Sequence, residues 1–271
     1  MTTAALFAAL PMYDNRETGP ANDALWAAMA ARLRDAGIEA PDRLTRGGDL
    51  EAQWRDPNLL FSQTCGYPYV KHLRRTVALL ATPHYEFPGC SGGAHRSFLV
   101  CRREEGHRAL GELRHRRAAI NSWTSNSGMN LFRAAIAPIA DGKPFFGAVV
   151  VTGSHLASLT AVIEGAADIA AIDCVTFALI GRMHPGLVAQ AVVLAETPPT
   201  LSLPFIASGR LPRSVTEAVR EALLDALGDP DLAQTCATLG LAGATLTRSA
   251  DYQPVLDLEE QAEALRYPRL A

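Results

Sequence analysis

Small polar residues gather at one point of the sequence in a pattern suited to holding an anion. The stretch from Ile120 to Pro138 leaves an apolar strand candidate, passes through four small residues and opens an amphipathic helix; the four are Ser125, Asn126, Ser127 and Gly128. The first N–H groups of a helix lack internal partners and the helix dipole is positive there, so backbone donors and serine hydroxyls together can hold an oxyanion without a lysine. A serine at this place can equally be a simple helix cap, and the sequence leaves both interpretations open.

A second junction between a strand and a helix repeats this design. The segment from Val149 to Val162 passes from an apolar run through Thr152, Gly153 and Ser154 to His155, and a helix-like pattern follows. His155 would stand in the first helical turn, where a neutral imidazole can donate a hydrogen bond to an anion and the positive helix end disfavours imidazolium. An exposed or capping histidine is the alternative.

Three further residues are candidates for contact with a small ligand. Asp173 follows the apolar run Ile169 to Ile172 and would lie at the carboxyl end of a strand, the edge at which open α/β sheets bind ligands. It could instead cap the helix that starts near Val175. Tyr13, after the first strand candidate, and Tyr67, in a turn, offer a flat wall and a hydroxyl. Packing in a hydrophobic core is the ordinary role of each tyrosine.

Motifs for other kinds of chemistry are missing from the sequence. It contains no Walker A motif, no GxGxxG and no HExxH. His84, Cys90 and His95 are close in sequence, but their spacing matches no standard zinc pattern. We therefore predict neither a metal nor a cofactor. The cysteines form no CxxC pair and are predicted to be buried reduced thiols; they are Cys65, Cys90, Cys101, Cys174 and Cys236.

Composition restricts the class of protein. The 271 residues are 48% hydrophobic and 20% charged, with a net charge of −3, which argues against disorder and against nucleic-acid binding. The longest apolar runs are far shorter than the roughly 20 residues of a membrane-spanning helix, so no membrane insertion is expected. The first basic residue, Arg16, comes after the first apolar run, unlike a secretory signal. The chain as written is expected to be cytoplasmic, and periplasmic only if a leader has been removed.

The pattern of apolar residues predicts strands and helices that would position these candidate residues. Short apolar runs alternate with helix-like patterns, which is typical of a sheet covered by helices. We therefore predict an α/β fold. The strands nearest the candidate site are predicted at Arg117 to Ile120, Ala148 to Val151 and Ile169 to Ile172, and helices follow the first two at Ser127 to Ile139 and Leu156 to Gly165.

In combination, several of these stretches resemble the solute-binding proteins of phosphate, phosphite and phosphonate ABC transporters. The stretches that carry the resemblance are LPMYD, SQTCGYPYV, GELRHRRAAINSWTSNSGMNLFR, GSHLASLTAV, GAADIAAID and SADYQPV. The resemblance implies the type 2 periplasmic-binding-protein fold, with two α/β lobes that close on a ligand, each a mainly parallel sheet flanked by helices. It places lobe 1 at 1–95 and 196–271 and lobe 2 at 96–195, and proline- and glycine-rich segments fall at both boundaries.

The resemblance also implies roles for single residues. The family's Ser-Thr-Ser-Gly helix start, which holds phosphoryl oxygens, matches Ser125 to Gly128, with Asn126 in place of the threonine. His155 matches a second phosphoryl donor, and Asp173 matches an acidic position that can face the organic substituent of a phosphonate. Tyr13 and Tyr67 match the aromatic positions of the first lobe.

The function expected from this resemblance is capture of a small oxyanion without catalysis. The ligand would be a phosphonate, phosphite or phosphate ester, and the partner the permease of an ABC transporter. The alternative is a cytoplasmic enzyme or sensor on the same fold that acts on a small organic acid. In an enzyme, His155 and Asp173 would be the acid and base pair.

Overall fold

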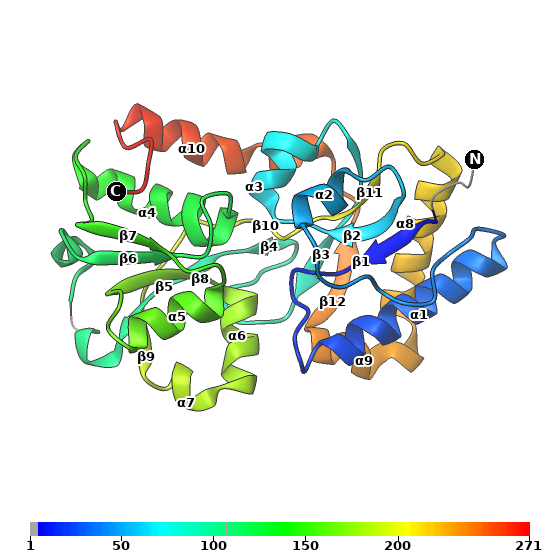
Figure 1. Ribbon diagram of the computed structural model, residues 1–271, viewed down its shortest axis with the longest axis horizontal. Helices are drawn as coiled ribbons and strands as arrows, with labels where there is room; N and C mark the ends of the chain where they lie inside the picture. Colours follow the sequence, from blue (N-terminus) through cyan, green and yellow to red (C-terminus); the bar gives the residue numbers. More distant parts are fainter. Residues whose placement is uncertain (1–4, 107) are drawn as a thin grey trace. The chain divides into compact units, whose positions relative to one another are not determined.

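The computed structural model describes residues 5–106 and 108–271 (Figure 1). The contacts divide the chain into two units. Unit 1 comprises Met1–Glu86 and Leu201–Asp251, and unit 2 comprises Phe87–Thr200 and Tyr252–Ala271. The predicted boundaries are at 95/96 and 195/196, and the last twenty residues are predicted to belong to the first lobe, whereas in the structure they pack in unit 2. Each unit has its own sheet and its own buried core.

Unit 1 is built on a five-stranded sheet in the order β1-β2-β11-β3-β12. The strands are β1 Phe7–Ala9, β2 Leu59–Gln63, β3 Val77–Tyr85, β11 Phe205–Ser208 and β12 Leu241–Thr245. The helices are α1 Gly19–Asp35, α2 Leu50–Arg55, α3 Gly66–Pro68, α8 Arg213–Gly228 and α9 Ala233–Leu239, with shorter turns η1 Tyr69–Leu73 and η5 Pro230–Leu232. Helix α8 packs on β2, β3 and β12, and α1 packs on α8 and α9. The first strand candidate of the sequence, the apolar run from Ala4 to Leu10 that precedes Tyr13, contains β1; Ala4 lies outside the described residues.

The core of unit 1 is a stack of aromatic rings between helix and sheet. Trp26 of α1 stacks on Phe61 of β2 with ring centroids 5.9 Å apart. Phe61 in turn stacks on Phe205 of β11 at 5.3 Å. All three side chains are almost completely buried, so their large apolar surfaces hold α1 against the sheet.

Unit 2 contains a second five-stranded sheet in the order β7-β6-β8-β5-β9. The strands are β5 Ser97–Arg102, β6 Arg117–Ile120, β7 Ala148–Val151, β8 Ile169–Asp173 and β9 Ala191–Glu196. The helices are α4 Leu131–Ala140, α5 His155–Ile163, α6 Cys174–Met183, α7 Pro185–Val188 and α10 Pro254–Ala264, with shorter turns η2 Arg103–Glu105, η3 Leu110–Leu113 and η4 Asn126–Asn130. The short helix η6 Ser249–Tyr252 contains the boundary between the two units. Helix α5 packs on β5, β6 and β8, while α4 packs on β5 and α10. Two short strands, β4 Ala94–His95 and β10 Thr200–Leu201, form a separate ribbon.

The predicted α/β class is confirmed, since helices flank the sheet of each unit (Figure 1). The sheets are more mixed than predicted, however. In unit 2, β6 runs parallel to β7 and β8, but β5 is antiparallel to both β8 and β9. In unit 1, β11 runs against β2 and β3, because this strand returns from the late part of the chain to the middle of the sheet.

The C-terminal segment joins unit 2 through hydrogen bonds to η4, to α4 and to the loop after α4. Asn130 donates to the carbonyl of Val255 at 2.9 Å, and Arg133 donates to the carbonyl of Pro268 at 2.7 Å. The carbonyl of Ala271 accepts from the backbone of Phe145 and of Phe146. Residues 252–271 were predicted to belong to lobe 1, and these bonds explain why they pack in unit 2 instead. Within the described part of the chain, no helix combines the length and the apolar character needed to cross a membrane.

Candidate functional site

The polar junction predicted after Ile120 exists and is buried. Strand β6 ends at Ile120, and the helical segment begins after Ser125, whose backbone is extended with φ −75° and ψ 133°. The hydroxyl of Ser125 accepts a hydrogen bond from the N–H of Gly128 at 3.0 Å. Ser125 is therefore a helix cap, which is one of the two roles that the sequence left open for it. The next side chain, Asn126, is fully buried.

The first turn of this helix is wider than an ordinary α-turn. In η4 the N–H of Asn130 donates to the carbonyl of Ser125 at 3.0 Å, five residues back, and α4 continues from there. The amide group of Asn126 donates to the hydroxyl of Thr200 at 3.1 Å and accepts from Asn130 at 3.1 Å. The side chain of Asn126 therefore holds this turn in place, and turns of this widened type are frequent at functional sites.

The second predicted junction meets the first. Helix α5 begins at His155, after Ser154, whose hydroxyl caps it by accepting from the N–H of Ala157 at 3.1 Å. The Nε2 atom of His155 lies 2.9 Å from the hydroxyl oxygen of Ser127, and the side chain of Ser127 is only 4% exposed. Two helix starts that are separate in sequence therefore share one hydrogen bond.

Gly128 makes this approach possible. A Cβ atom at this position would lie 1.9 Å from Oδ1 of Asn121 and 3.1 Å from Cε1 of His155. The first distance is far shorter than any real contact between such atoms, so a side chain at position 128 would displace Asn121. The Oδ1 atom of Asn121 is itself buried and has no hydrogen-bond partner among the described residues.

Burial keeps His155 neutral near pH 7. It lowers the pKa of the imidazole below its usual value, and the nearby Asp173 carboxylate and the carbonyl of Ala171 offset this only in part. The neutral ring carries one N–H, so the direction of the hydrogen bond to Ser127 depends on the tautomer. In the tautomer with the proton on Nε2, the ring donates to the Ser127 hydroxyl oxygen and the hydroxyl proton is directed to another acceptor. The pair can therefore donate a hydrogen bond to an anion while it carries no charge of its own.

Asp173 lies at the end of β8, as predicted, and caps the next helix. Its Oδ1 accepts from the N–H of Thr176 in α6 at 2.8 Å, so the capping alternative is correct for this oxygen. Its Oδ2 lies 3.9 Å from Nδ1 of His95. Asp173 is 2% exposed. This buried carboxylate thus faces a histidine that the sequence analysis did not select for the site.

His95 is completely buried in the ribbon strand β4. Neither of its ring nitrogens has a hydrogen-bond partner among the residues that the structure describes. Burial lowers the pKa of His95, and Asp173 raises it by a smaller amount, so the ring is neutral near pH 7. The sequence signal for this residue was weak: a single histidine just before the apolar run Phe98 to Cys101.

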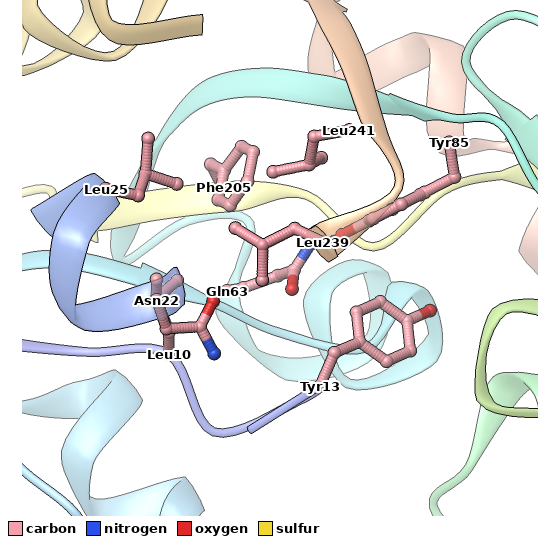
Figure 2. Close-up of a pocket in the computed structure, with 9 residues that line it drawn as sticks. All are labelled: Leu10, Tyr13, Asn22, Leu25, Gln63, Tyr85, Phe205, Leu239 and Leu241. Atoms are coloured by element: carbon pink, nitrogen blue, oxygen red, sulfur yellow. Dashed lines mark hydrogen bonds between the residues drawn. The ribbon is translucent and has the colours of Figure 1, made fainter. Parts of the chain in front are cut away.

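The two predicted tyrosines lie in unit 1. The half-buried ring of Tyr13 packs edge-on against Tyr85, with centroids 5.3 Å apart, and both rings border a small cavity of about 20 Å³ (Figure 2). In Figure 2, Gln63 reaches the same cavity, and its amide donates to the hydroxyl of Tyr85 at 3.0 Å. The volume suits about one water molecule. Tyr67 is not among the residues that line this cavity; it is buried, with the ammonium group of Lys71 5.6 Å from its ring centroid.

The zinc alternative is not favoured by the geometry. His84 bonds to the hydroxyl of Thr245 in unit 1, whereas Cys90 and His95 belong to unit 2. In residues 5–106 and 108–271, no three His, Cys, Asp or Glu side chains are grouped as a metal ion would require.

Comparison with solved structures identifies the fold. PhnD1 from Prochlorococcus marinus, solved with methylphosphonate, matches with a TM-score of 0.76 and 14% identity over 96% of this chain and 98% of that one. A binding-protein component of a phosphonate ABC transporter from Pseudomonas aeruginosa matches with a TM-score of 0.76 and 12% identity, over 96% and 87%. XAC2383 from Xanthomonas citri, solved with chloride, matches with a TM-score of 0.75 and 16% identity, over 97% and 99%. The two-lobed fold implied by the resemblance is confirmed.

Sequence comparison identifies the family. No curated protein matches the chain significantly. A family model does match, over residues 7–252, and describes the periplasmic substrate-binding protein of phosphonate ABC transporters. This family consists of binding proteins and not of enzymes, so the predicted solute-binding role is confirmed over the alternative of an enzyme with His155 and Asp173 as acid and base. The chain belongs to the phosphonate substrate-binding protein family of ABC transporters.

Proposed function

We propose that this chain binds a small phosphorus oxyanion at the joined helix starts of unit 2 and delivers it to the permease of an ABC transporter. The ligand is a phosphonate, a phosphite or a phosphate ester. The observation that supports the proposal is the 2.9 Å contact between the Ser127 hydroxyl and Nε2 of His155, each in the first turn of its own helix.

The chemistry of this contact suits an oxyanion. Each helix start contributes the positive end of a dipole, roughly +0.5 of an elementary charge, and backbone N–H groups without intrahelical partners. The Ser127 hydroxyl, held by neutral His155, adds a side-chain donor. Donors fixed before the ligand arrives lose little entropy on binding, so even a site without a basic side chain can be strong.

We further infer that the organic part of the ligand faces Asp173. The resemblance assigns this acidic position to the substituent of a phosphonate, and Asp173 lies at the carboxyl end of β8, at the start of α6. A buried carboxylate beside neutral His95 disfavours a second anionic group and favours a hydroxyl or an ammonium group. An amine-bearing alkylphosphonate is thus expected to bind more tightly than methylphosphonate.

Titration calorimetry with methylphosphonate, phosphite, phosphate and sulfate tests this function. Ser127→Ala and His155→Ala should each weaken binding of the preferred phosphorus oxyanion by roughly ten- to a hundredfold, because loss of one donor to a buried charge costs about 1 to 3 kcal/mol. Asp173→Asn should reduce the preference for the amine-bearing ligand and leave methylphosphonate affinity within a few fold, since Asn can still cap α6.

Matched controls separate a local effect from a general one. Ser214 and His184 are exposed and lie outside the two junctions, so Ser214→Ala and His184→Ala should keep wild-type affinity. Equal affinity of wild type, Ser127→Ala and His155→Ala for the phosphorus oxyanion would exclude this site. Heat release with none of the phosphorus oxyanions would exclude the ligand class.

A further inference from the structure

Two cysteine side chains that are distant in sequence meet beside the candidate site. The Sγ atoms of Cys90 and Cys174 lie 3.4 Å apart, within hydrogen-bonding distance for sulfur. Cys174 is the first residue of α6 and directly follows Asp173, while Cys90 lies in the turn before His95. Cys101, Cys174 and Cys236 are buried, as predicted for all five cysteines, but Cys65 and Cys90 are half-buried.

We propose that Cys90 and Cys174 are a redox modification site that forms a reversible disulfide bond. A disulfide requires a sulfur separation of about 2.05 Å, so each sulfur needs to move by less than 1 Å from its position here. The backbone already brings the two segments together. A Cβ atom added at Gly89 would lie 2.8 Å from Cβ of Cys174, which shows how closely the turn packs on the start of α6.

Both segments are held in place by backbone bonds. The N–H of Cys90 donates to the carbonyl of Phe87 at 3.0 Å, and Ser91 and Ala94 exchange two hydrogen bonds of 3.0 Å. The N–H of Cys174 donates to the carbonyl of Arg96 at 3.0 Å. The thiols therefore face each other across two ordered segments.

The surroundings of Cys174 leave space beside its side chain. A cavity of about 400 Å³ borders Cys174 and is lined mainly by apolar side chains, among them Phe98 and Phe177, with Glu196 also on its wall. Displacement of a side chain next to a cavity does not force neighbouring atoms together, as it would in a filled core. The shift of Cys174 toward Cys90 is therefore compatible with the packing.

The two thiols have different roles in the reaction. The hydrogen bond between the two thiols lowers the pKa of Cys90 below its usual value, while the same bond and burial raise the pKa of Cys174. Cys90 is also the more exposed of the pair. A thiolate that solvent can reach is the group that attacks an external disulfide, so Cys90 reacts first and Cys174 second.

The oxidant is a low-molecular-weight disulfide, written RSSR. The Cys90 thiolate attacks one sulfur of RSSR, which forms a mixed disulfide and releases one RS⁻, and this thiolate takes up a proton to become RSH. Cys174 then loses its proton to solvent and attacks the Cys90 sulfur, which releases the second RS⁻. In total, two protein thiols are oxidised to one disulfide and RSSR is reduced to two RSH.

The test uses the full chain and 2-hydroxyethyl disulfide, a small neutral oxidant that the carboxylates of Asp173 and Glu196 do not repel. Dilute reduced protein is oxidised under native conditions, its remaining thiols are alkylated, and the peptides are mapped by mass spectrometry without reduction. We expect a peptide pair linked through Cys90 and Cys174. The oxidised protein should melt several degrees higher than the reduced protein, because the bond closes a long loop, and dithiothreitol should reverse the change.

Variants test the order of attack. Cys174→Ser keeps a hydroxyl that can donate to Cys90 and should accumulate the mixed disulfide on Cys90. Cys90→Ser should leave Cys174 as a free thiol, because Cys174 is buried. Cys101→Ser, a buried cysteine outside the pair, should form the Cys90 to Cys174 link as the wild type does. Absence of the linked peptide from folded wild type, or equally fast modification of Cys174 in Cys90→Ser, would overturn the proposal.

Discussion

At the scale of single residues, Gly128 limits how the candidate site can be built. A Cβ atom there would lie 1.9 Å from Oδ1 of Asn121 and 3.1 Å from Cε1 of His155. We predict that Gly128→Ala displaces Asn121 and lengthens the contact between Ser127 and His155. Overpacking of this kind costs about 1 to 3 kcal/mol in the free energy of unfolding. Oxyanion affinity should fall at least tenfold, as measured by calorimetry alongside urea unfolding.

A second glycine supplies the control for this prediction. Gly186 lies in helix α7, has ordinary backbone angles, and would have no atom within 4 Å of an added Cβ. Gly186→Ala should therefore leave affinity unchanged and alter the free energy of unfolding by about 0.5 kcal/mol or less. Wild-type affinity in Gly128→Ala would show that the approach of the two helix starts is not needed for binding.

Patterns within short stretches of the sequence predicted some residues of the candidate site and missed others. Ser127 and His155 stand in short polar runs between a strand and a helix, so their position in the fold depends on neighbours in sequence, and the structure brings them together. The proximity of His95 to Asp173 depends instead on the antiparallel pairing of β5 with β8, in which Ser97 lies opposite Asp173. No pattern within the segment around His95 encodes that pairing, so the sequence analysis did not select this residue.

At the scale of elements, the packing of α10 on α4 depends on one buried arginine. Arg133 in α4 is 3% exposed; its guanidinium donates to Asn130 at 2.6 Å and to the carbonyl of Pro268 at 2.7 Å, and lies 3.6 Å from a carboxylate oxygen of Glu259 in α10. Arg133→Met removes these bonds and leaves Glu259 without this charge partner. Loss of one member of a buried ion pair costs about 3 kcal/mol, which urea unfolding should show.

An exposed arginine on another helix provides the comparison. Arg213 of α8 pairs with Glu217 at 2.7 Å, but its side chain is 91% exposed. Such a surface pair contributes little, so Arg213→Met should change the free energy of unfolding by less than about 0.5 kcal/mol. Amide hydrogen exchange in residues 254–271 should be faster in Arg133→Met than in the wild type, and it should be unchanged in Arg213→Met. Similar unfolding curves for both variants would contradict the assigned role of Arg133.

At the scale of the whole molecule, the chain passes between its two units after residues 86, 200 and 251. The proline- and glycine-rich stretches marked the neighbourhood of the first two passages, because breaks in periodicity are visible in sequence. The third passage lies within the short helix η6, between Asp251 and Tyr252, and α10 follows it closely. The placement of α10 is decided by distant partners, Asn130 and Arg133, so composition around residue 251 carries no sign of it.

The pH dependence of stability is a property of the whole molecule, and between about pH 5 and 6.5 two histidines, the buried His95 and the half-buried His155, should dominate it. The pKa values of His95 and His155 are both lowered, mainly by burial, and Asp173 offsets the effect only partly. An unfolded histidine titrates near pH 6.5. Below that pH the unfolded chain binds more protons than the folded chain, so the free energy of unfolding falls as the pH drops, by up to about 1.4 kcal/mol per pH unit for each histidine. The loss ends once the pH passes the folded-state pKa.

The carboxylates change the free energy of unfolding in a lower pH range than the histidines do. The pKa values of Asp229 and Asp251 are lowered by backbone and arginine hydrogen bonds, so their contribution is present at neutral pH and is lost only below about pH 4. Urea unfolding of the ligand-free protein between pH 5 and 6.5 therefore isolates the histidines. His95→Asn should reduce the slope of the free energy of unfolding against pH in this range, whereas exposed His184→Asn should not.

A flat profile for the wild type would mean that both rings gain a proton in the folded state as easily as in the unfolded chain. The Ser127 and His155 pair would then meet the oxyanion with a positive charge, and ligand affinity should rise as the pH falls.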